Sequence, residues 1–111
     1  MGATKENLFT EDQYRLAAYT KALAHPARIA ILQQLSLLDS CVCGDLVNDI
    51  GLAQSTISQH LKELKSAGLI QGTIEGVRVC YCINPNAMAL LQTELNILFE
   101  NLKICKSDDC C

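Results

Sequence analysis

The residues best suited to chemistry in this sequence of 111 residues are its seven cysteines. In a reducing compartment, clustered cysteines indicate metal binding or redox chemistry rather than a scaffold of structural disulfides. Thiolates are soft ligands, so they favour arsenite, antimonite, cadmium, lead or copper(I), or zinc in a cage of four thiols. The cysteines form three groups along the chain: Cys41 and Cys43; Cys80 and Cys82; and Cys105, Cys110 and Cys111.

The third group closes the chain in the segment "CKSDDCC". Cys105, Cys110 and Cys111 stand on a short polar linker that could fold around one ion, and trivalent arsenic takes three thiolates in a pyramid. Adjacent cysteines are poorly suited to a mutual disulfide, which favours a ligand role over a redox role. The sequence therefore predicts the tail as the preferred metal site, and the alternative is a disordered end whose thiols have no role.

The other two groups lie inside the chain. Cys41 and Cys43 are the alternative ligands, although free cysteines are also common as small buried hydrophobic residues. Cys80 and Cys82 alternate with apolar residues in a predicted hairpin, so we expect both to face outward on one side as an exposed pair without metal. A short strand at 41–43 would bring the two pairs together. A site of four thiols is then possible, but we expect the pairs on opposite faces of the sheet, which works against it.

Histidine offers little to a metal ion in this chain. The two histidines, His25 and His60, lie at a helix start and on a predicted DNA-reading helix. We expect His25 to cap or pack and His60 to contact DNA or solvent, so a zinc or nickel site built on histidine is disfavoured. No paired carboxylates, nucleophile–base set or phosphate loop occurs, so neither an enzyme nor a catalytic cofactor is expected.

Composition is consistent with one small cytoplasmic domain. The hydrophobic fraction of 50% is ample for a core, and the net charge of −3 gives no global indication of nucleic-acid binding. No apolar run is long enough to span a membrane, and "MGATKENLFTEDQY" does not resemble a signal peptide. We expect one domain over residues 1–104, followed by the cysteine-containing tail at 105–111.

Hydrophobic periodicity predicts a mainly α fold with a small β-hairpin. The order is helix, helix, short strand, helix, helix, two strands and a long helix, which makes a winged helix-turn-helix. Glu75 and Gly76 mark the hairpin turn, and Gly51 and Gly68 suit left-handed helix ends. Inner faces are expected at Ile29, Leu32 and Leu35, and at Ile57, Leu61 and Leu64. The segments are helices at 11–23, 26–38, 45–51, 53–68 and 85–104, a short strand within 39–44, and a hairpin at 69–83.

The fourth of these helices carries a polar outer face that is suited to DNA. Glutamine pairs with adenine, hydroxyls reach phosphates or base edges, and lysine neutralises phosphate. A plain solvated face would look similar, but the preceding turn and the following hairpin favour DNA. The predicted contacts are Gln54, Ser55, Thr56, Ser58, Gln59, His60, Lys62 and Lys65, with Arg78 on the hairpin.

The last helix carries an apolar stripe with spacings of three and four residues. Such spacing is typical of a helix that packs against another helix. The stripe either forms a dimer interface or closes the protein's own core. The predicted interface residues are Met88, Leu91, Leu95, Leu98 and Leu102.

Two stretches, "KALAHPARIAILQQL" and "GLAQSTISQHLKELKSAGLIQGTIEGVRVCYCI", resemble the ArsR/SmtB family of metal-responsive repressors. The resemblance runs from about Thr20 to Ile83. It implies a homodimer formed by the first and last helices, and a repressor that leaves double-stranded operator DNA with an inverted repeat when an inducer binds. "CVCG" is similar to the "CVC" of arsenic and cadmium/lead sensors in the family, but here the usual second cysteine falls at Gly44. Ala53 stands where many members have a serine cap.

The cysteine content and this resemblance favour the arsenic-responsive branch, with As(III) or Sb(III) as inducer. The first alternative is a repressor that responds to cadmium, lead or another soft metal. The second is a thiol redox or persulfide sensor, although such sensors have a cysteine in the second helix, where this chain has none. The third is a metal-carrying thiol protein with no DNA role, which would leave the polar helix unexplained.

Overall fold

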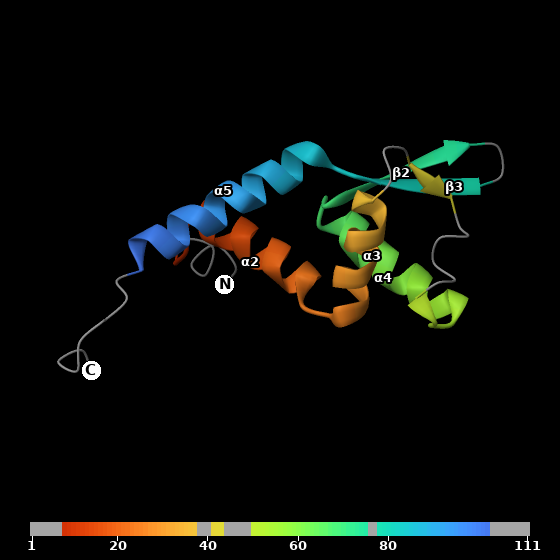
Figure 1. Ribbon diagram of the computed structural model, residues 1–111. Helices are drawn as coiled ribbons and strands as arrows, with labels where there is room; N and C mark the ends of the chain where they lie inside the picture. The colour runs from red at the N-terminus through yellow and green to blue at the C-terminus, as the bar shows by residue number, and fades with distance from the viewer. Residues whose placement is uncertain (1–7, 38–40, 44–49, 76–77, 103–111) are drawn as a thin grey trace.

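The computed structural model describes residues 8–37, 41–43, 50–75 and 78–102 (Figure 1). The tail cysteines 105, 110 and 111 therefore lie wholly outside the described residues. Most of the helix expected at 45–51 lies outside them as well. The observed order confirms the predicted mainly α fold with a β-hairpin. The elements are α2 (Glu11–Leu23), α3 (Pro26–Ser36), β1 (Val42–Cys43), α4 (Gln54–Ser66), β2 (Ile70–Glu75), β3 (Arg78–Ile83) and α5 (Pro85–Asn101).

Local sequence signals explain where the helices begin. Thr10 and Gln13 form a capping box at the start of α2, in which each side chain accepts a hydrogen bond from the other residue's backbone N–H. The prediction that His25 caps a helix is confirmed, because its Nδ1 accepts from the backbone N–H of Ala27 at 3.0 Å. Asn84 caps α5 in the same manner. These caps satisfy backbone donors that have no partner inside a helix.

Two glycines stand on either side of α4, at the ends of the segment that contains it. Gly51 and Gly68 have φ angles of 87° and 84°, in the left-handed region that only glycine enters at little cost. Gly51 precedes the turn into α4, and Gly68 reverses the chain into β2. The backbone N–H of Asn84 then donates to the carbonyl of Leu69, which ties the start of α5 to the end of this turn.

The described strands form one antiparallel sheet in the order β1-β3-β2. In the hairpin, Ile70 pairs with Ile83 and Glu75 pairs with Arg78. β1 pairs with the other edge of β3, with Val42 opposite Tyr81 and Cys43 opposite Cys80. The expected brief strand is therefore present, and it forms the third strand of the wing sheet.

One hydrophobic core joins the helices to the sheet. α4 contributes Ile57 and Leu64, which are at most 1% exposed, as the helical period predicts. The inner face of α3 differs from the prediction, because Ile29 is 40% exposed and Ile31 takes the buried place. Further core residues are Tyr19, Ala22, Leu32, Leu35, Leu61, Leu69, Ile70, Ala87 and Leu91.

The molecule has two ends with different roles in the packing. Figure 1 shows α2 and α5 side by side at one end, with α3, α4 and the hairpin grouped at the other. α4 packs against α3 and β2, so its inward side is held by both a helix and the wing. None of the helices in the described part of the chain is long and apolar enough to cross a membrane.

Candidate functional site

The open face of α4 carries the polar residues that the sequence singled out. Ile57, Leu61 and Leu64 turn inward, so the residues between them point away from the core. The exposed side chains of this face are Gln54, Ser55, Thr56, Ser58, Gln59, Lys62 and Lys65. They offer amides, hydroxyls and ammonium groups along one helix, which is the donor and acceptor set that suits the major groove of DNA.

His60 does not belong to this exposed set, and its predicted position is corrected. The residue is only 8% exposed, and its ring centroid lies 4.3 Å from that of His25. Its Nδ1 accepts a hydrogen bond from Nε of Arg28 at 3.2 Å. Position 60 follows Ile57 by three residues, so it falls on the buried side of the helix. His60 therefore fastens α4 to the start of α3.

The surroundings of His60 disfavour its protonated form. Burial lowers the pKa of His60 below its ordinary value, and the charges of His25 and Arg28 lower it further. Glu63 acts in the opposite direction but does not reverse the shift. Arg28 also reaches the carbonyl oxygens of Lys21 and Ala22 at 3.4 and 3.3 Å. One arginine thus links the end of α2 to α4 through a neutral imidazole.

Lys65 lies against the hairpin, a contact that sequence reasoning missed. A Cβ added at Gly72 of β2 would stand 3.0 Å from Nζ of Lys65 and 3.2 Å from its Cε. The lysine side chain therefore occupies the space that a larger residue at position 72 would fill. The signal in the sequence was a glycine inside a strand pattern, which often marks a close approach. Arg78 is the first residue of β3, and its side chain lies outside the described set.

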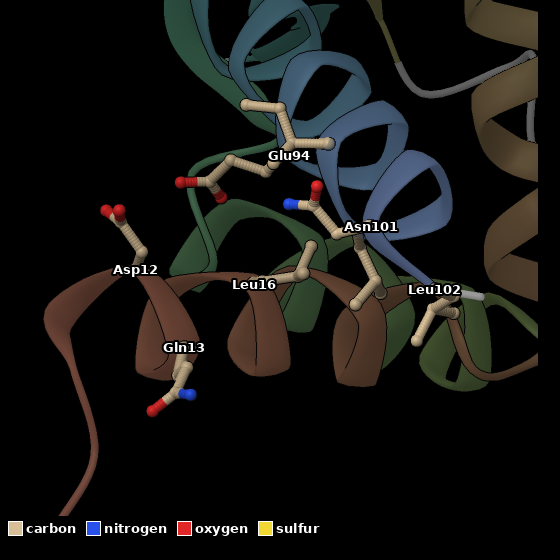
Figure 2. Close-up of a pocket in the computed structure, with 8 residues that line it drawn as sticks. Asp12, Gln13, Leu16, Glu94, Asn101 and Leu102 are labelled. Carbon is tan, nitrogen blue, oxygen red and sulfur yellow. The ribbon is translucent and has the colours of Figure 1, made fainter.

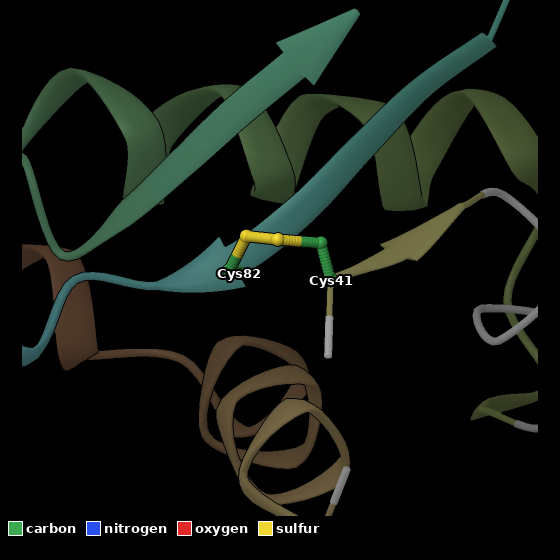
Figure 3. Close-up of a disulfide and its surroundings, with 2 residues drawn as sticks. All are labelled: Cys41 and Cys82. Atoms are coloured by element: carbon green, nitrogen blue, oxygen red, sulfur yellow. A yellow bond between two sulfur atoms is a disulfide. The ribbon is translucent and has the colours of Figure 1, made fainter. Parts of the chain in front are cut away.

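The second feature is a group of cysteines on the wing sheet. Cys41 and Cys82 form a disulfide between the start of β1 and β3, with their Cα atoms 4.4 Å apart (Figure 3). Cys80 is also disulfide-bonded and has no exposed surface. In the strand register, Cys80 stands opposite Cys43. The Val42–Tyr81 pair lies between these two cysteine positions, so the two cysteine pairs occupy alternate positions along one antiparallel ladder.

This arrangement corrects two expectations. Cys80 is buried and Cys82 is partly buried, so they are not the exposed pair that alternation alone predicted. The Cys41–Cys82 bond also places these two residues on the same face of the sheet rather than on opposite faces. The reason is the pairing of β1 with β3: residues two apart on each strand share a face, so two C-x-C segments in this register bring their cysteines together.

Cys41, Cys80 and Cys82 are oxidised in this structure. Among the residues that the structure describes, no group of three or more histidine, cysteine, aspartate or glutamate side chains is set to hold a metal ion. A disulfide sulfur is not a thiolate, so binding of a soft ion at this place first requires reduction. The predicted ligands Cys105, Cys110 and Cys111 lie outside the described residues.

The third feature is the outer side of α2 and α5. A groove of about 350 Å³ runs between these helices, with Leu16 and Leu102 on its floor and sides and Asp12, Gln13, Glu94 and Asn101 around it (Figure 2). Of its lining residues, Glu94 also pairs with α2, because Nε of Arg15 donates to Oε1 of Glu94 at 3.0 Å. The second carboxylate oxygen of Glu94 is buried without a hydrogen-bond partner.

The predicted interface residues of the last helix fall into two groups, one packed in the core and one exposed. Leu91 is buried in the core, and Met88 and Leu95 are packed against it. Leu98 and Leu102 remain 39% and 51% exposed. Two further residues that the stripe pattern omitted, Ile97 and Phe99, are 53% and 60% exposed. The second half of α5 therefore presents an apolar surface that the described chain does not cover.

Comparison with known proteins points to one family. Residues 25–71 match the family model described as "Bacterial regulatory protein, arsR family". The HTH-type transcriptional regulator YgaV of Escherichia coli (strain K12) is 37% identical over 82 residues, which span 73% of this chain and 83% of the relative.

Solved structures agree with this match. The crystal structure of Rv0081 of Mycobacterium tuberculosis is 39% identical, with a TM-score of 0.58 over 81% of this chain and 93% of that chain. The homodimeric winged helix-turn-helix DNA-binding domain Mb0332 of Mycobacterium bovis, titled a possible ArsR-family regulator, is 28% identical. Its TM-score is 0.63, over 82% of this chain and 84% of that chain.

Proposed function

Because this chain belongs to the ArsR family of bacterial regulatory proteins and is a DNA-binding transcriptional regulator, we propose that it is a repressor controlled by a soft ion. In this proposal, the protein leaves its operator when cysteine thiolates bind the ion. Arsenite or antimonite is the inducer that we place first, and cadmium or lead comes next. The observation that carries the proposal is the gathering of cysteines from the β1 segment and β3 in the wing sheet, whose strand β3 packs on α3 and whose strand β2 packs on α4.

The DNA contact that we propose is made by the exposed face of α4. Gln54, Ser58 and Gln59 would meet base edges, while Lys62 and Lys65 would neutralise phosphates. Arg78, at the start of β3, would reach a neighbouring phosphate or groove. The support for this role is the open polar face of α4, fixed from behind by α3 and β2.

We further propose that the repressor is a homodimer that binds an inverted repeat. Leu98 and Leu102, with Ile97 and Phe99, would meet the same face of a second copy across a two-fold axis. The homodimeric solution structure of the Mb0332 domain supports this arrangement. Two copies of α4 would then enter successive major grooves about 34 Å apart.

The proposal is tested by fluorescence anisotropy on the DNA upstream of the protein's own gene. The fully reduced chain should bind this DNA and should be released by arsenite, with a loss of affinity of roughly 5- to 150-fold. Lys62→Ala should weaken binding at all sequences and lower the salt slope by about 1. Binding that no soft ion weakens would refute control by a metal or metalloid, and no binding at all would refute the repressor.

A second candidate function is a thiol redox-responsive repressor, which the Cys41–Cys82 disulfide favours. In that case, forming the disulfide would change the affinity for DNA without any metal. The same assay separates the two candidates when hydrogen peroxide is added in the presence of a chelator. Release by peroxide alone, reversed by a dithiol reductant, would favour the redox function over the metal-responsive one.

A further inference from the structure

The cysteines of the wing sheet are close enough to share one ion after reduction. In a disulfide, Cβ atoms stand about 3.5–4.5 Å apart. Two sulfurs on one tetrahedral ion with a metal–sulfur bond of about 2.3 Å stand about 3.8 Å apart. A pair such as Cys41 and Cys82, with Cα atoms at 4.4 Å, therefore reaches this spacing by side-chain rotation alone.

Cys80 supplies a third sulfur from the same strand. It precedes Cys82 by two residues, so both belong to one face of β3 and their Cα atoms lie about 6.6–6.8 Å apart along it. Exposure rises from Cys80, which is fully buried, through Cys82, which is partly buried, to Cys41, which is exposed. An ion can therefore enter from the side of Cys41 and end against a buried sulfur.

We propose that reduced Cys41, Cys80 and Cys82 form a three-thiolate site for a trivalent metalloid such as arsenite. This inference rests on the proposed function, because it names the site through which a soft inducer would act. It departs from the sequence-based preference for the tail and adds two wing cysteines whose role the sequence left open. Cys43, opposite Cys80 in the register, is the position from which a fourth thiol would come.

The charge of the product favours a trivalent ion. Each of three thiols gives its proton to one hydroxyl of As(OH)₃; three S–H and three As–O bonds break, three As–S bonds form, and three waters leave. No electron is transferred in this step. The product is neutral, whereas a divalent ion with three thiolates carries a negative charge. A neutral product costs less to bury beside Cys80, which has no contact with solvent.

Reduction must come first, since the disulfides hold the sulfurs in this structure. Each disulfide takes up two electrons and two protons from a dithiol, which becomes a cyclic disulfide. The ion then replaces the covalent link between β1 and β3 with a larger one. β1 lies shortly before the DNA-reading region, and β3 begins at Arg78. A change in the spacing of these two strands therefore shifts the wing relative to α4.

The test uses the reduced full-length chain and arsenite. Cys41→Ser combined with Cys82→Ser should still bind operator DNA but should require at least about tenfold more arsenite for release. Thr73→Ser is a matched control, because Thr73 pairs with Cys80 in the hairpin and the change removes no thiol. Cys110→Ser combined with Cys111→Ser is the competing variant, which reports on the tail.

Unchanged release in the Cys41 and Cys82 variant, while the wild-type chain responds, would overturn this site and leave the proposed function intact. Failure of the wild-type chain to respond to any soft ion refutes the proposed function instead. If the variant does not fold, wild-type protein is alkylated with iodoacetamide with and without arsenite, and the modified peptides are measured by mass spectrometry. Protection of Cys41 and Cys82 by arsenite supports the site, since Cys80 is buried with or without the ion, and equal alkylation of Cys41 and Cys82 in both samples overturns it.

Discussion

Among single residues, His60 shows how burial changes the role that a side chain's type predicts. By its type it belongs with the polar residues of a DNA-reading face, yet it is packed against His25 and accepts a hydrogen bond from Arg28. An acceptor at Nδ1 requires the neutral ring in the folded state. The imidazole therefore connects α4 to α3 through its hydrogen bond with Arg28. Protonation of His60 would place a positive charge beside this arginine.

Because His60 is neutral in the folded state, we expect the free energy of unfolding to fall in mild acid. The folded-state pKa of His60 is lowered, chiefly by burial, so below about pH 6.5 the unfolded chain binds a proton that the folded chain does not. The free energy of unfolding should therefore decrease as the pH falls from about 6.5 toward the folded-state pKa. In His60→Asn, whose Oδ1 can accept from Arg28, the decrease should be smaller. Urea unfolding between about pH 5.5 and 7.5 measures both, and parallel curves would contradict the assignment.

At the scale of the element, α4 begins without a side-chain cap. Ala53 occupies the N-cap position in extended conformation, with φ −61° and ψ 149°, and forms no side-chain hydrogen bond to the helix. Ala53 therefore leaves this helix start without the side-chain cap that a serine supplies in many members of the family. The helix is held by its buried stripe and by packing on α3 and β2, which compensate for the missing cap.

Restoring the cap should stabilise the protein. Ala53→Thr supplies a hydroxyl that accepts from an unpaired backbone N–H in the first turn, which should raise the free energy of unfolding by about 1 kcal/mol. Ala53→Val is the isosteric control, because it has the same shape and no acceptor. Thermal or urea unfolding of the two variants gives the difference directly. Equal stability of the two would show that water already satisfies this end of the helix.

For the whole molecule, the end formed by α2 and α5 remains incomplete as a single chain. Ile97, Leu98 and Phe99 are exposed in the second half of α5, and Leu102 is exposed at its C-cap. The Arg15–Glu94 ion pair lies beside them, and the buried free oxygen of Glu94 has no donor within the described chain. A second copy of the chain would cover these apolar side chains.

The dimer is tested by placing a charge on this surface. Leu98→Glu should weaken self-association by about 2–3 kcal/mol, on the order of 100-fold, because a carboxylate would be buried without a partner. Affinity for an inverted-repeat operator should fall with it. Leu37→Glu is the control, since Leu37 is 81% exposed at the end of α3. Sedimentation velocity compares the two, and an unchanged dimer in Leu98→Glu would exclude this interface.

Much of the fold followed from patterns within short segments. The hairpin, the left-handed Gly51 and Gly68, and the buried face of Ile57 and Leu64 all depend on local turn chemistry and on the helical or strand period. α3 was predicted less well, because Ile29 and Ile31 are both apolar and only the neighbouring elements decide which is covered. The local pattern therefore locates the apolar face of a helix only approximately. The packing of neighbouring elements decides which apolar residues of that helix are buried.

The sequence by itself determined the residue types that can act: a polar face on one helix, an apolar last helix, and cysteines in C-x-C segments. Tertiary structure alone decided that His60 packs against His25 and Arg28 and that Cys41 meets Cys82. The reason is that period two assigns residues to a face within one strand, whereas the register between β1 and β3 depends on pairing over 41 residues of chain. A local pattern contains no information about that distance, so the thiol cluster became visible only in the folded sheet.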